Sequence, residues 1–139
     1  RGLAPGRVRR VCRGCGGIAG GVGKVTPGAE KLVEVTEEAR KVGIQQARPG
    51  GWLGDISSAI QKHVEASGFS VIRQFVGHGI GRQMHEDPQV PNFGTPGTPP
   101  RLKAGMTLAI EPMVNAGGHE VYMKPDVWTN CTVEGGLSD

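Results

Sequence analysis

The sequence changes character at residue 26, and this change limits how much of the chain can fold. Residues 1–25 contain eight glycines, six Lys or Arg residues and no Asp or Glu. Their apolar residues follow neither the two-residue repeat of a strand nor the 3.6-residue repeat of a helix. A glycine-rich segment is costly to order and has little apolar surface to bury. We therefore predict a Gly/Arg-rich leader over residues 1–25, either disordered or translated out of frame, and a folded domain over residues 26–139.

The net charge depends on this leader. The formal net charge is +3, but beyond residue 25 the chain has ten Lys or Arg residues against 13 Asp or Glu residues. The excess positive charge therefore belongs to the leader and not to a folded face. The leader also lacks the interleaved aromatic residues on which the bases of RNA stack. We expect no specific nucleic-acid partner.

The lengths of the apolar runs and the spacing of the cysteines bear on the cellular location of the protein. No run reaches the length of about 18 apolar residues that a membrane span needs, and no apolar signal-peptide region is present. Cys12 and Cys15 have the C-x-x-C spacing of zinc and redox sites, but no second pair of ligands follows, and Cys131 stands alone. We interpret the pair as incidental and expect a cytoplasmic protein without a membrane partner.

Two amphipathic helices are expected at the start of the domain. Thr26 and Pro27 suit the N-cap and the first position of a helix that ends before Pro49. Asp55 is expected to cap a second helix, which Gly68 closes. Apolar residues recur at helical spacing in both segments: Leu32, Val35, Ala39 and Val42 in the first, and Ile56, Ala59, Ile60 and Val64 in the second.

Several strands are expected after the helices. β-Branched and aromatic residues predict a strand over 69–76, and alternation of apolar residues predicts another over 106–110. Shorter strands are expected over 121–123 and 128–133, whereas five prolines between 87 and 100 predict a loop. Two helices followed by several strands indicate the α+β class, with a mostly antiparallel sheet and covering helices.

The stretch V-G-H-G-I-G-R-Q-M-H-E-D-P-Q-V, from Val76 to Val90, carries the residues most suited to chemistry. It does not fit a phosphate loop, because its third glycine comes one residue too early for G-x-G-x-x-G and no helix is expected after it. His78 and His85 match no short zinc motif, so the spacing leaves open both a shared metal site and a turn that contains two histidines. Gly77 and Gly79 flank His78 and permit close approach of neighbouring backbone.

A second candidate residue is Glu111, in G-M-T-L-A-I-E-P-M-V-N. Alternation places Glu111 on the face opposite Leu108 and Ile110, yet its neighbours in the sequence are apolar. An ionised carboxylate in apolar surroundings needs a cation or strong hydrogen bonds, whereas a strand-end Glu that reaches solvent needs neither. Both interpretations are compatible with these residues.

Taken together, these motifs resemble the type I methionine aminopeptidases. The pattern G-H-G-I-G-R-x-M-H-E-x-P-x-V, followed by G-M-x-L-A-I-E-P-M-V-N and D-x-W-T, is similar to the catalytic half of these enzymes from about Thr26 to Ser138. The resemblance implies the pita-bread (creatinase/aminopeptidase) fold, mainly its C-terminal half, in which two αβ halves enclose a dinuclear metal site. It also implies a monomer that removes methionine from the N-terminus of nascent polypeptides.

The resemblance further implies roles for individual residues. His78 and Glu111 match metal ligands, and Glu111 would also move a proton. His85 matches the histidine that contacts the substrate and stabilises the tetrahedral intermediate, so the catalytic pair is His85 and Glu111. Met84 and Trp128 match walls of the methionine pocket; Met84 replaces the usual aromatic residue, although its thioether can contact a methionine side chain. The implied cofactors are two divalent ions of cobalt, manganese, iron or zinc.

The family's site has five metal ligands, and this chain matches two of them. Two aspartates belong upstream of the Thr26 helix, where the sequence is rich in Gly and Arg, and a last glutamate belongs a few residues after Ser138, in an S-x-x-x-E pattern. We therefore expect an incomplete catalytic domain over 26–139, inactive as the 139-residue chain, and a leader that arises from a frameshift or a misassigned start. The alternatives are an Xaa-Pro aminopeptidase or creatinase-like relative, and a non-catalytic binding module with this fold.

Overall fold

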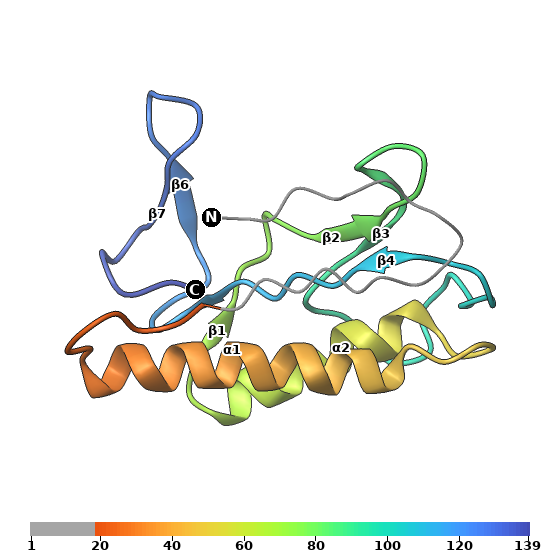
Figure 1. Ribbon diagram of the computed structural model, residues 1–139, viewed down its shortest axis with the longest axis horizontal. Coiled ribbons are helices and arrows are strands. Elements are labelled where there is room, and N and C mark those ends of the chain that lie inside the picture. Colours follow the sequence, from red (N-terminus) through yellow and green to blue (C-terminus); the bar gives the residue numbers. More distant parts are fainter. Residues whose placement is uncertain (1–18) are drawn as a thin grey trace.

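The computed structural model describes residues 19–139 as two helices that lie along one side of a set of short strands (Figure 1). Most of the predicted leader, residues 1–25, lies outside the described residues, and so does the pair Cys12 and Cys15. The division of the chain at residue 26 therefore stays a prediction. Within the described part, no helix is long and apolar enough to cross a membrane.

Helix α1 spans Pro27–Gln46, and helix α2 spans Leu53–Ala66. The Thr26 hydroxyl caps α1 by accepting a hydrogen bond from the backbone N–H of Ala29 at 3.4 Å. The predicted start of α1 is therefore confirmed. Helix α2 ends where Gly68 adopts a φ of 82°, in the left-handed region that glycine tolerates best, so the predicted stop is also confirmed.

Helix α2 begins earlier than the sequence predicted. Trp52 occupies the N-cap, and Asp55 lies within the first turn, where its carboxylate accepts the backbone N–H of Trp52 at 3.1 Å. The other carboxylate oxygen accepts the backbone N–H of Gly97 at 2.8 Å. The prediction that Asp55 is the N-cap residue is wrong. Its side chain reaches back to the N-cap backbone, as the acidic residue of a capping box does.

The proline-rich segment supplies acceptors for the first turn of α2. The backbone N–H of Leu53 donates to the carbonyl oxygen of Pro100 at 2.9 Å, and that of Gly54 donates to the carbonyl oxygen of Thr98 at 3.1 Å. The first N–H groups of a helix have no partner inside the helix and need one elsewhere. A segment that the sequence marks as a loop is therefore fixed against α2.

Seven short strands in the described part of the chain form three antiparallel sheets. The three-stranded sheet has the order β3-β2-β4, while β1 pairs with β5 and β6 pairs with β7. The strands are β1 (Ser70–Val71), β2 (Gly77–Gly79), β3 (Glu86–Val90), β4 (Leu108–Ala109), β5 (Val114–Asn115), β6 (Val121–Met123) and β7 (Asn130–Thr132).

The regular strands are shorter than most of the predicted ones. Only β1 is regular within 69–76, and only β4 within 106–110, whereas β6 coincides with the predicted 121–123 and β7 occupies the middle of 128–133. The prediction of a loop from 87 to 100 is wrong in its first part, which β3 occupies. Strand β3 lies at the edge of its sheet, where a proline, which lacks an N–H, is tolerated.

The core lies between the helices and the strands. All of the apolar residues predicted to face the core from the two helices are buried except Val42 and Ala59. The buried ones pack with apolar residues from β1, β3 and β5. Gly43 lets the two helices approach closely, because a Cβ at this position would lie 2.8 Å from atoms of the Ile60 side chain. Ile56 and Ile60 are the largest fully buried side chains, so the core is built mainly from medium-sized aliphatic residues.

We expect Ile60→Ala to lower the free energy of unfolding by about 2–5 kcal/mol, because Ile60 is 0% exposed and its truncation leaves a cavity. Urea denaturation followed by circular dichroism measures the change. Ile44→Ala, at a 51% exposed position of the same helix pair, is the control and should alter stability by no more than about 0.5 kcal/mol. Equal effects of the two substitutions would contradict this assignment of the core.

Candidate functional site

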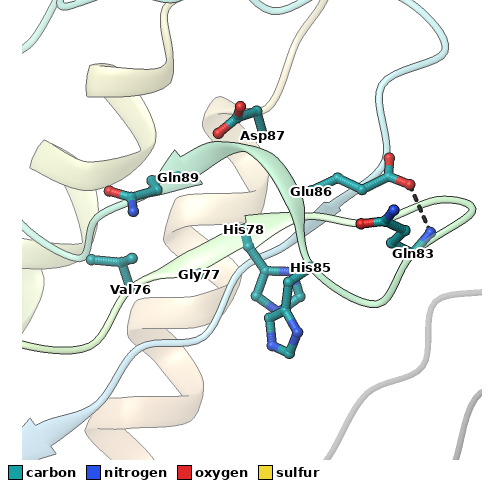
Figure 2. Close-up of a pocket in the computed structure, with 8 residues that line it drawn as sticks. All are labelled: Val76, Gly77, His78, Gln83, His85, Glu86, Asp87 and Gln89. Atoms are coloured by element: carbon teal, nitrogen blue, oxygen red, sulfur yellow. Dashed lines mark hydrogen bonds between the residues drawn. The ribbon is translucent and has the colours of Figure 1, made fainter.

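Strand β2 places His78 in the middle of the three-stranded sheet. His78 pairs with Gln89 of β3 on one side and with Ala109 of β4 on the other. Its side chain is 12% exposed and lines an open cavity of about 640 Å³ (Figure 2). The imidazole is thus held by the sheet and still accessible from one side.

The two glycines beside His78 are required by the close packing of the strands. A Cβ at Gly77 would overlap with the carbonyl oxygen of Ala109, and a Cβ at Gly79 would overlap with the carbonyl oxygen of Asp87. Backbone atoms cannot move aside as the end of a flexible side chain can. The prediction that these glycines permit close approach of neighbouring backbone is confirmed.

His85 lies beside His78 although the two are seven positions apart in the sequence. The β2–β3 register shifts between His78 and Gly79, and the intervening turn returns the chain to the same side of the sheet. The centroids of the two imidazole rings are 4.2 Å apart, and the rings are tilted by 50°. Figure 2 shows the two rings side by side in the cavity. The structure therefore brings together the two histidines that their spacing alone left unconnected.

The backbone selects which nitrogen of His78 is available. Nδ1 of His78 lies 2.8 Å from the carbonyl oxygen of Gly79. A carbonyl oxygen only accepts hydrogen bonds, so Nδ1 carries the proton in this contact and the lone pair of a neutral ring is on Nε2. Such a bond to the other ring nitrogen is typical of histidines that bind metal ions.

Glu111 faces the free nitrogen of His78. Its Oε1 lies 3.9 Å from His78 Nε2. The Glu111 side chain is 47% exposed, so the carboxylate reaches solvent, as in the second of the two interpretations of the sequence. Two donors that share one zinc ion in a tetrahedral site lie about 3.4 Å apart. The separation of 3.9 Å is about 0.5 Å longer than this. No third His, Cys, Asp or Glu joins a metal-binding group within the described residues.

Met84 and Trp128 occupy different places in the fold. Met84 precedes His85 and is 63% exposed. Trp128 is 87% exposed and lies in the turn of the β6–β7 hairpin, which stands apart from β2, β3 and β4 in Figure 1. The described residues therefore do not enclose a pocket around these two side chains, and their contact with a methionine side chain stays a prediction.

Two polar residues near the site were missed by sequence reasoning. The Glu86 carboxylate accepts the backbone N–H of Gln83 at 2.7 Å and so closes the turn that carries His85. Asn92 is 0% exposed, and its Nδ2 donates to the backbone carbonyl of Glu111 at 2.8 Å. The run V-P-N-F, an amide between apolar residues, was the one available signal for Asn92.

The turn that carries Trp128 is organised by Asp126. The Asp126 carboxylate accepts hydrogen bonds from the Thr129 hydroxyl at 2.6 Å, from the Thr129 N–H at 2.8 Å and from the Trp128 N–H at 3.0 Å. These bonds, the Thr129 hydroxyl first, lower the pKa of Asp126 below its usual value. The same turn holds Val127 at a φ of 58°, a conformation that β-branched residues rarely adopt.

Comparison with known proteins places this geometry in a family. The family model described as metallopeptidase family M24 matches residues 14–136, which is most of the chain. The chain therefore belongs to metallopeptidase family M24.

The relatives of the chain include methionine aminopeptidases. The chain is 58% identical over 118 residues to the methionine aminopeptidase of Clostridium perfringens, an alignment that covers 85% of this chain and 47% of the relative. It is similar to the crystal structure of methionine aminopeptidase from Thermotoga maritima, with a TM-score of 0.82 and 52% identity over 84% of this chain and 47% of that chain. The chain thus spans about half the length of the relatives it matches.

A weaker likeness extends to another branch of enzymes. The prolidase from Pyrococcus horikoshii is 26% identical with a TM-score of 0.57, over 67% of this chain and 26% of that chain. By both identity and TM-score, the chain is more similar to the methionine aminopeptidases than to this prolidase. The resemblance drawn from the two motifs is confirmed, and so is the α+β, pita-bread fold.

We expect Gly79→Ala to destabilise the protein by about 1–3 kcal/mol, because the added methyl group overlaps with backbone of β3 and the strands must separate. Urea denaturation measures the loss, and the NMR signals of the His78 and His85 rings should shift. The matched control is Gly28→Ala in α1, where a Cβ meets nothing within 4 Å. This change should be neutral or stabilising by up to about 1 kcal/mol. A fully stable Gly79→Ala variant would rule out the close packing.

We expect the Trp128 turn to respond to pH only in the acidic range. The ionised form of Asp126 accepts the three hydrogen bonds, so its pKa is lower in the folded than in the unfolded protein. The contribution to stability is therefore complete above the usual Asp pKa of about 3.9 and declines as the pH falls through the lowered pKa. An NMR titration of the Trp128 and Thr129 amides measures the pKa of Asp126 in the folded protein, and Asp126→Asn is the non-titrating control. A midpoint above the usual Asp value would contradict the expected sign.

Proposed function

We propose that this chain forms part of the active site of a cytoplasmic, metal-dependent aminopeptidase that removes methionine from the N-terminus of nascent polypeptides. The observation that carries the proposal is the meeting of His78, His85 and Glu111, which come from separate segments of the chain. His78 Nε2 lies 3.9 Å from Glu111 Oε1, and the two imidazole centroids are 4.2 Å apart. Identity of 58% to a methionine aminopeptidase supports the substrate class.

His78 and Glu111 are the proposed metal ligands. The contact of His78 Nδ1 with the Gly79 carbonyl orients the ring and leaves Nε2 free towards Glu111. Imidazole and carboxylate donors together suit ions of cobalt, manganese, iron or zinc. When bound, such ions supply a Lewis acid and lower the pKa of a water molecule. The chemistry of the two donors therefore fits the cofactor that the family implies.

His85 and Glu111 are the proposed catalytic residues. The Glu111 carboxylate is half exposed and can accept a proton from the attacking water. The ring of His85, beside His78, can donate a hydrogen bond to the oxygen of the scissile carbonyl as negative charge develops on it. Removal of one such donor typically lowers kcat by about 10²–10³. Met84, next to His85, and Trp128 are the proposed contacts of the methionine side chain.

The pairing of Asp139 indicates where a further ligand would enter. Asp139 and Val114 exchange two antiparallel backbone hydrogen bonds, Val114 N to Asp139 O at 2.7 Å and Asp139 N to Val114 O at 2.9 Å. In an antiparallel ladder, each step along one strand is one step back along the other. A strand that continued this register would face Glu111 three residues later. The glutamate of the S-x-x-x-E pattern, four residues after Ser138, would stand at that position.

Two protein donors are too few to hold a dinuclear site. We therefore propose that the remaining ligands come from sequence that these 139 residues do not contain, and that the 139-residue chain alone does not hydrolyse peptides. Its residues 26–139 would contribute the histidine side of the site. We expect Co²⁺ to bind weakly to the 139-residue chain, with His78 and Glu111 as its ligands.

Calorimetric titration with Co²⁺ and an assay on the peptide Met-Gly-Met test this function. We expect His78→Ala to weaken Co²⁺ binding at least about tenfold, because it removes one of two donors. The control is His63→Ala, since His63 also has a carboxylate partner, Glu38 at 3.2 Å, but lies on α2. The control should bind cobalt as the unchanged protein does, and no variant should release methionine.

Three results would count against the proposal. Equal loss of cobalt binding in the two histidine variants would remove His78 from the site. Release of methionine by the 139-residue chain with bound metal would refute its proposed inactivity. Binding of Met-Gly-Met that is indifferent to cobalt and to His78→Ala would favour a non-catalytic binding module.

A further inference from the structure

Asn92 is a buried polar residue beside the proposed site whose bonding is incomplete. Its side chain is 0% exposed, Nδ2 donates to the carbonyl oxygen of Glu111 at 2.8 Å, and Oδ1 has no hydrogen-bond partner among the described residues. A side-chain amide can make about four hydrogen bonds, and each unmet buried group costs free energy. Burial of the Asn92 amide therefore costs stability, which its one bond, to the Glu111 backbone, offsets only in part.

The strand register explains why Asn92 reaches Glu111. Gly77 pairs with Val90 on one side of β2, and His78 pairs with Ala109 on the other. Asn92 lies two residues after Val90, on the β3 side, and Glu111 lies two residues after Ala109, on the β4 side. Because β2 begins at Gly77, it does not separate the two chains at this level, and the Asn92 amide bridges them.

The backbone of Glu111 needs such a bridge. Glu111 lies between β4 and β5, outside both ladders, and the next residue, Pro112, has no N–H to donate. The carboxylate is half exposed, and its described polar neighbour is His78 at 3.9 Å. Its place beside His78 therefore depends on how firmly the Glu111 backbone is held.

We propose that Asn92 is a positioning residue, whose buried amide holds the Glu111 backbone so that the carboxylate stays beside His78. This inference rests on the proposed function, in which Glu111 and His78 act together. The orientation of the amide follows from its partner, because a carbonyl oxygen accepts only and Nδ2 must face it. Since β3 follows directly after His85, the same bond also ties the segment that carries His85 to Glu111.

Asn92→Asp tests the proposal, because it replaces the Nδ2 donor with an acceptor of almost the same volume. Asn115→Asp is the matched control: Asn115 is also 0% exposed, and its Nδ2 donates to a backbone carbonyl, that of Gly118, at 2.8 Å. The first readout is the NMR cross-relaxation between the Glu111 γ protons and the His78 ring. The second is the affinity for Co²⁺, measured by calorimetry.

We expect Asn92→Asp to lower the cross-relaxation at least twofold and the Co²⁺ affinity by about 10–100-fold, the usual effect of losing a residue that orients a ligand. Asn115→Asp should change neither, although both variants lose a buried hydrogen bond. Asn92→Ala, which also lacks the donor but adds no charge, should behave as Asn92→Asp does and serves if the acidic variant does not fold.

The two readouts separate this inference from the proposed function. If the unchanged chain binds no cobalt, the proposed metal site is wrong, but the cross-relaxation still reports whether Asn92 positions Glu111. The inference is overturned if a folded Asn92 variant keeps the cross-relaxation of the unchanged protein. It is also overturned if Asn115→Asp reduces the cross-relaxation as much, because the effect would then be general loosening of the fold.

Discussion

The backbone of β2 lies so close to both neighbouring strands that neither glycine beside His78 can carry a side chain. The positions of the other site residues follow from this contact. The shift of register after His78 returns the chain so that His85 lies against it, and the pairing with β4 directs the chain to Glu111. His78, His85 and Glu111 therefore lie together because the backbones of β2, β3 and β4 pack closely.

The helices make this arrangement stable. Strands of two to five residues bury little by themselves, and a two-stranded ribbon is marginal in water. Apolar residues of α1 and α2 cover one side of the strands, while the other side of the sheets has no helix over it among the described residues (Figure 1). The chain matches about half the length of its relatives, so an uncovered side is what one half of a two-part fold is expected to present.

Local chemistry could be predicted from the sequence, and long-range pairing could not. The helix start at Thr26 and the stop at Gly68 follow from side chains within one turn, and both are confirmed. Strands β2, β3 and β5 were missed. Glycines in β2 and Pro88 in β3 are untypical of strands, and the partner of β5, β1, is distant in the sequence. The three site residues were named from motifs, but their contact distances needed the register of the sheet.

The proline-rich segment and the start of α2 share their hydrogen bonds, and this sharing has a consequence for how the protein opens. The Asp55 carboxylate accepts the backbone N–H groups of Trp52 and Gly97. The first two N–H groups of α2 donate to the backbone carbonyls of Pro100 and Thr98. Neither part can unfold locally without exposing the polar groups of the other. The two segments therefore form one cooperative unit, whose amide protons should exchange with solvent together and more slowly than proline and glycine content alone would suggest.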